Sequence, residues 1–145
     1  MLRKLNHVGH IVENIEDAIK NYKDLLGLEP WKLGIVELQS VNDSAKIAWL
    51  EIGNNYIELI EPTTPDGFLA QMLKAKGAGL YHIAILADDF DEEIAKLKAK
   101  GCMLMESEMV FCGADQRVAF MVPEQTKGVL IELIDAARLP AEFRA

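Results

Sequence analysis

The chain has 145 residues, half of them apolar, and a formal net charge of −8 at neutral pH, which is enough sequence to bury the core of one domain. It shows no signal-peptide core and no run of about 18 apolar residues, so a cytoplasmic protein without a membrane span is predicted. The acidic charge disfavours nucleic acid and anionic membranes as partners and leaves a small molecule.

The first predicted unit begins at His7 with a short apolar strand, an acidic turn and a helix. Asn14 is placed to cap this helix, with Asp17 three residues on as its capping-box partner. Apolar side chains then recur with the 3.6-residue period of a helix that packs on a sheet, and Gly27 suits a left-handed helix end. Further strands are expected over residues 34–41, 45–52 and 55–61.

The second predicted unit repeats this order after a linker. Pro and Gly residues break the pattern near residues 62–67, and a short helix over residues 68–76 is expected within a linker of about residues 63–78. A strand then starts at His82, and a helix capped by Asp89 ends at Gly101. The remaining strands are expected over residues 103–111, 117–122 and 129–134.

The two units keep the same internal spacing, which identifies a tandem repeat. The sequence IELI occurs at residues 57–60 and again at 131–134. The separation from histidine to glutamate is 58 − 7 = 51 residues in the first copy and 132 − 82 = 50 in the second. A single α+β domain of two βαβββ modules is therefore predicted, at about residues 3–62 and 79–135, with a curved, barrel-like sheet around a cleft.

Four polar residues occupy matched positions in these modules. Strand alternation puts Glu58 and Glu132 on the sheet face that the helices leave open, where a carboxylate among apolar neighbours needs a partner or a metal. His7 and His82 lie on the first strand of each module, so a pseudo-two-fold axis brings all four side chains together. Each residue alone is compatible with an ordinary core or surface position, but together they predict one divalent metal. His10 falls on the other face from His7 and is interpreted as structural.

These residues carry a resemblance to a known family. The stretches LNHVGHIVENIEDAIKNYKDLLGLEP, NNYIELIEP, GAGLYHIAI and VPEQTKGVLIELI resemble the vicinal oxygen chelate superfamily, with the glyoxalase and bleomycin-resistance fold, and within it the methylmalonyl-CoA epimerases. The resemblance implies that His7, Glu58, His82 and Glu132 bind one divalent ion, such as cobalt, zinc, nickel or manganese. It also implies a 1,1-proton transfer through an enediolate of an acyl-CoA, with Glu132 and Glu58 as the catalytic residues, in a homodimer.

Two features depart from the epimerase pattern and leave the substrate open. The turn at residues 112–117 is shorter and more acidic than the glycine-rich turn usual there, and Val122 stands where a histidine precedes proline. Arg117, in this turn, is interpreted as a solvated surface cation rather than a contact for CoA phosphates. The main alternative is a glyoxalase I type isomerase with the same ligands, followed by an extradiol dioxygenase and a metal-free ligand-binding protein of this fold.

Two other parts of the sequence are given no functional role. Trp31, Trp49 and Tyr81 are assigned to the core, because aromatic residues in apolar strands usually pack there. The C-terminal segment, residues 136–145, lies beyond the second module and carries no recognisable motif.

Overall fold

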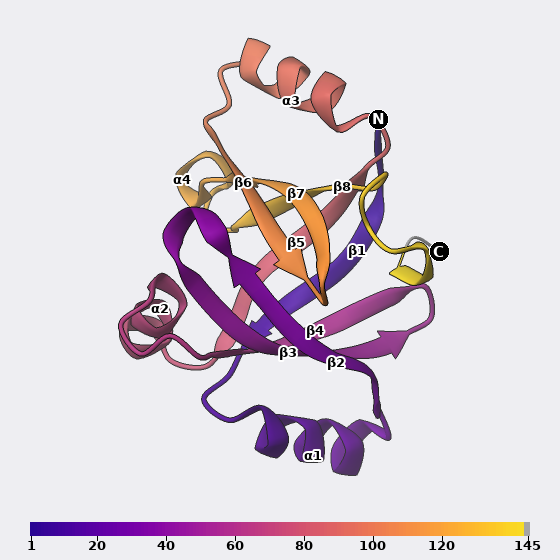
Figure 1. The fold of residues 1–145 in the computed structure, drawn as a ribbon, viewed down its shortest axis with the longest axis vertical. Helices are drawn as coiled ribbons and strands as arrows, with labels where there is room; N and C mark the ends of the chain where they lie inside the picture. The colour runs from indigo at the N-terminus through magenta and orange to yellow at the C-terminus, as the bar shows by residue number, and fades with distance from the viewer. Residues whose placement is uncertain (144–145) are drawn as a thin grey trace.

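The computed structural model of the protein describes residues 1–143 and shows an eight-stranded closed barrel with helices on its outside (Figure 1). The elements of the first half are β1 (Leu2–Ile11), α1 (Ile15–Leu26), β2 (Pro30–Leu38), the 3-10 turn η1 (Gln39–Val41), β3 (Asp43–Ile52), β4 (Asn55–Pro62) and α2 (Phe68–Lys76). Those of the second half are β5 (Gly79–Ala87), α3 (Phe90–Ala99), β6 (Leu104–Phe111), β7 (Ala114–Met121), α4 (Pro123–Thr126), β8 (Ile131–Asp135) and η2 (Ala141–Phe143).

The strands run around the barrel in the order β1-β4-β3-β2-β6-β7-β8-β5. Each half of the chain contributes four neighbouring strands, and in each half the first strand pairs in parallel with the last. Antiparallel pairing of β1 with β5 and of β2 with β6 joins the halves. The prediction of an α+β fold with two βαβββ units in one barrel-like sheet is confirmed, and closure leaves no free sheet edge.

The two long helices begin and end where the sequence places them. Asn14 accepts a hydrogen bond from the Asp17 backbone N–H at 2.8 Å, and Asp89 caps α3 in the same way. Gly27 and Gly101 have φ angles of 68° and 84°, the left-handed region in which glycine is favoured. No helix within the described residues is long and apolar enough to cross a membrane.

The two faces of the sheet bury different sets of side chains. On the outside, Leu59 packs against α1 and Leu133 packs against α3. On the inside, Trp49, Tyr56 and other apolar residues form the largest buried cluster. The prediction that the helix of each module covers the outer face is confirmed for α1 and α3, whereas Leu69 of α2 packs with the inner cluster. The polar residues of the inner face are therefore set in an apolar interior.

Several predicted strand limits differ from the structure; β1 and β5, for example, begin at Leu2 and Gly79, ahead of the predicted starts at His7 and His82. The strand expected over residues 34–41 starts earlier, at Pro30, and ends at Leu38, because the next three residues form a 3-10 turn before β3. Strand β7 starts at Ala114 rather than at residue 117, because the hairpin turn consists of Cys112 and Gly113 alone. These two residues have φ angles of 50° and 80°. Strand β8 starts at residue 131 rather than 129, after the short helix α4, which the sequence did not predict.

The C-terminal segment packs on the barrel instead of leaving it. Leu139 and Phe143 are almost fully buried, and the Phe143 ring meets Trp49 edge to face with centroids 4.4 Å apart. In Figure 1 this yellow segment turns back against the barrel after β8. The segment is therefore part of the same core as the interior of the barrel.

Candidate metal centre

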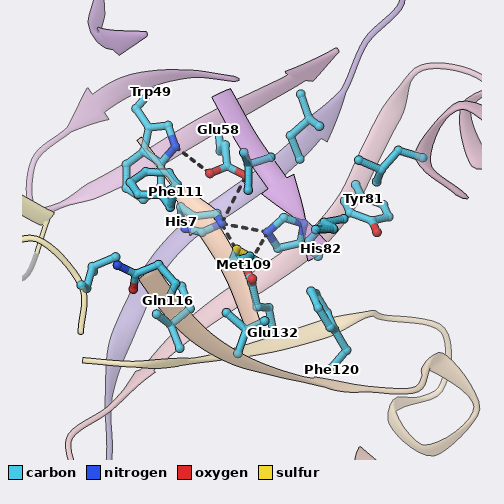
Figure 2. A pocket seen from close by; sticks show the side chains of 17 residues that line it. His7, Trp49, Glu58, Tyr81, His82, Met109, Phe111, Gln116, Phe120 and Glu132 are labelled. Atoms are coloured by element: carbon cyan, nitrogen blue, oxygen red, sulfur yellow. Dashed lines mark hydrogen bonds and ion pairs between the residues drawn. The ribbon is translucent and has the colours of Figure 1, made fainter. Parts of the chain in front are cut away.

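The barrel interior brings the predicted ligand residues together (Figure 2). His7 from β1 and His82 from β5 point their Nε2 atoms at one another, 2.8 Å apart. Glu132 from β8 places Oε2 3.1 Å from Nε2 of His82 and 3.5 Å from Nε2 of His7. All three side chains are buried, and their potential ligand atoms lie within 4.8 Å of one another.

Glu58 lies at the edge of this group. Its Oε1 is 3.7 Å from Nε2 of His7, while its Oε2 accepts a hydrogen bond of 2.6 Å from the indole N–H of Trp49. In Figure 2, Glu58 and Glu132 approach the two histidines from opposite sides. The structure thus groups three of the four predicted ligands tightly, and the role of Glu58 as the fourth stays a prediction.

The spacing of the three donor atoms suits a single metal ion. Ligand atoms about 2.1 Å from an ion in a tetrahedral site stand roughly 3.4 Å from one another. The three observed separations, 2.8, 3.1 and 3.5 Å, are close to this value. Two imidazoles and a carboxylate are also a donor set that divalent transition metals accept, so the residues fit the ion that the sequence predicts.

The charges of the site point the same way. Burial alone would raise the pKa of Glu132, but the two neighbouring histidines outweigh it and lower the pKa to about 2. Burial would likewise lower the pKa of His7, yet Glu58 and Glu132 together raise it. The buried Glu132 carboxylate therefore stays ionised and attracts positive charge, which a divalent cation can provide.

An apolar pocket opens over these side chains. Its volume is about 60 Å³, and each of the eight strands contributes at least one side chain to its lining. Tyr81 and Gln116 are polar residues in the lining that the sequence did not assign to the site. Such a cavity holds a few water molecules or a compact substrate group rather than a whole coenzyme.

Two β-bulges explain why two side chains of this region do not follow the inward–outward alternation of a regular strand. In the pairing of β1 with β5, Asn6 and Tyr81 are each an extra residue without a partner on the facing strand. Each directly precedes one of the two predicted ligand histidines, and each turns inward beside it instead of outward. Period-two alternation predicts the opposite direction for both residues, so sequence reasoning missed them.

Two other polar residues lie outside the pocket. His10 is on the outer face of β1, where its Nδ1 is 2.9 Å from the hydroxyl of Tyr22 on α1, in agreement with the face predicted for it. Arg117 forms an ion pair of 2.7 Å with Asp91 and lies over the Phe90 ring of α3. It is therefore on the helix side of the sheet and not in the pocket.

Comparison with known proteins places the chain in a family. Residues 6–120 match the Glyoxalase/Bleomycin resistance protein/Dioxygenase superfamily. The chain belongs to this superfamily. Within it, the human mitochondrial methylmalonyl-CoA epimerase is 30% identical over 136 residues, which are 93% of this chain and 75% of that protein.

Two further members of the superfamily cover nearly the whole chain. YqjC of Bacillus subtilis, an uncharacterized protein, is 34% identical over 92% of this chain and 93% of its own length. The crystal structure of methylmalonyl-CoA epimerase from Mycobacterium tuberculosis superposes with a TM-score of 0.80 at 26% identity, over 99% of this chain and 93% of that one. The relatives with named activities support an isomerase-type, epimerase-like member of the superfamily.

Proposed function

We propose that the protein is a metal-dependent epimerase that inverts a carbon next to a thioester, with methylmalonyl-CoA as its substrate. The observation that supports this most is the pair of carboxylates, Glu58 and Glu132, on opposite sides of the histidines in an apolar pocket (Figure 2). Inversion requires that a proton leaves one face of the carbon and returns on the other. Two acid–base groups on opposite sides meet that requirement.

His7, His82 and Glu132, with Glu58 as the fourth ligand of this proposal, hold the ion. When bound, the divalent ion supplies Lewis acidity that polarises the thioester and carboxylate oxygens and so acidifies the C–H between them. Glu132 is our first candidate for the base. Its ion pairs with His7 and His82 both involve Oε2, so Oε1 is the oxygen that we propose takes the proton. Trp49 holds one oxygen of Glu58 and leaves the other directed at the centre.

The pocket supports a short acyl group as the reacting part of the substrate. Its lining is mainly aliphatic and aromatic, which suits the methyl group of a methylmalonyl unit, and its volume leaves the coenzyme outside the barrel. The named relatives act on methylmalonyl-CoA, which supports the same acyl group here.

Deuterium uptake at C2 of methylmalonyl-CoA in D2O, followed by mass spectrometry, tests this function. Metal-loaded protein is expected to exchange the proton, chelated protein to lose the activity, and metal addition to restore it. A protein that binds metal but shows no exchange above the blank would contradict the proposal. Methylglyoxal with glutathione is then the substrate to try, because a glyoxalase I type isomerase needs the same ligands.

A further inference from the structure

The second ring nitrogens of the two histidines have different surroundings. Nδ1 of His7 is 2.8 Å from Oδ1 of Asn6. Nδ1 of His82 is buried and has no hydrogen-bond partner within residues 1–143, and it faces the Cα atom of Gly9. The pseudo-two-fold symmetry of the barrel is therefore broken at the two Nδ1 atoms. The hydrogen bond at Nδ1 determines the orientation of the ring and the protonation of Nε2.

The orientation of the Asn6 amide is set by a contact at the other end of the chain. Its Nδ2 donates a hydrogen bond of 3.0 Å to the carbonyl oxygen of Phe143, so its Oδ1 faces His7. An amide oxygen only accepts hydrogen bonds, which requires that Nδ1 of His7 carries a proton. In the neutral ring, the lone pair is then on Nε2, the atom directed at the metal centre.

The contact partner of Asn6 is itself held rigidly. Both Asn6 and Phe143 have 0% exposure. A second buried amide, Gln116 on β7, donates a hydrogen bond of 2.7 Å to the carbonyl oxygen of Arg138 in the same C-terminal segment. The amides of Asn6 and Gln116, one from each half of the barrel, thus both bind the C-terminal segment. The Gln116 contact helps to hold the Phe143 carbonyl in place for Asn6.

We propose that Asn6 is a positioning residue of the metal centre, which accepts the Nδ1 proton of His7 and is held in that orientation by the carbonyl of Phe143. The C-terminal segment is consequently a part of the metal site, although it contributes no ligand. This inference rests on the proposed metal site but not on the reaction or its substrate. Partners of this kind orient a ligand histidine, and their loss typically costs about 10- to 100-fold in metal affinity.

Calorimetric titration of the chain with Zn2+ separates a positioning role from a purely structural one. Asn6→Ala is expected to lower the affinity about 10- to 100-fold. Asn6→Asp keeps an acceptor for His7 but loses the donor to Phe143, so it is expected to recover most of the metal affinity without recovering the melting temperature. Asn14→Ala, which removes only the α1 cap, is the matched control and should lower the melting temperature alone.

Nitrogen-15 NMR of the wild-type protein provides a readout that needs no variant. In the Zn2+ complex, we expect a proton on Nδ1 of His7 and the metal on Nε2. Absence of that proton, or an Asn6→Ala protein that folds and binds Zn2+ within about twofold of wild type, would overturn the inference. Failure of the wild type to bind Zn2+ would instead contradict the metal site on which the proposed function also rests, and so overturn both.

Discussion

Glu132→Gln is expected to lower the rate of deuterium uptake at C2 of methylmalonyl-CoA by about 10²- to 10⁴-fold, the contribution of a well-placed acid–base group. The amide keeps the shape of the side chain and an oxygen for the ion, but it cannot accept a proton. The two histidines outweigh the effect of burial and hold the pKa of Glu132 at about 2, so the wild-type side chain is ionised across the neutral range.

Metal content must be measured with this variant, because Glu132 is also a proposed ligand. The prediction requires that the loss of exchange exceeds any loss of bound metal at saturating ion concentration. If exchange falls only in proportion to bound metal, Glu132 is a ligand alone and the base lies elsewhere. Glu51→Gln, an exposed glutamate on β3, is the control and should leave the rate unchanged.

Gly9→Ala is expected to weaken Zn2+ binding by about tenfold or more and to destabilise the fold by about 1–3 kcal/mol. A Cβ at Gly9 would overlap Cε1 and Nδ1 of the His82 ring. His82 is 4% exposed, so its ring can move only by disturbing the other ligands. Zn2+ calorimetry and thermal unfolding measure the two effects.

Gly34→Ala is the matched control for this prediction. A Cβ at Gly34 would overlap Sγ of Cys112, so it overcrowds the barrel as well, but against a side chain that is not a ligand. We expect Gly34→Ala to reduce stability without changing Zn2+ affinity. Equal losses of affinity in the two variants would mean that general barrel strain, and not the position of His82, controls metal binding.

The barrel and the convergence of the four candidate ligand residues were predictable from sequence because both follow from patterns that repeat along the chain. The repeated IELI segments sit on regular strands, so alternation gave the inward direction of Glu58 and Glu132 correctly. The histidines were found because each lies on the first strand of a module and the internal spacing repeats. Cap residues such as Asn14 depend only on contacts three residues away, which sequence shows directly.

The residues that sequence missed depend on bulges or on contacts between distant segments. Asn6 and Tyr81 turn inward only because each is the extra residue of a bulge, which shifts the alternation by one. The partner of Asn6 is 137 positions away, in a segment without periodic pattern. Trp49 was assigned to the core correctly, but its hydrogen bond to Glu58 depends on the register of two strands.

Anomalous X-ray diffraction from crystals of the protein loaded with Co2+ tests the central claim most directly. We predict one strong anomalous peak per chain, between Nε2 of His7, Nε2 of His82 and a carboxylate oxygen of Glu132, with Glu58 completing the ligands. A peak outside the barrel, or none within this group in crystals of protein that binds the ion in solution, would contradict the account.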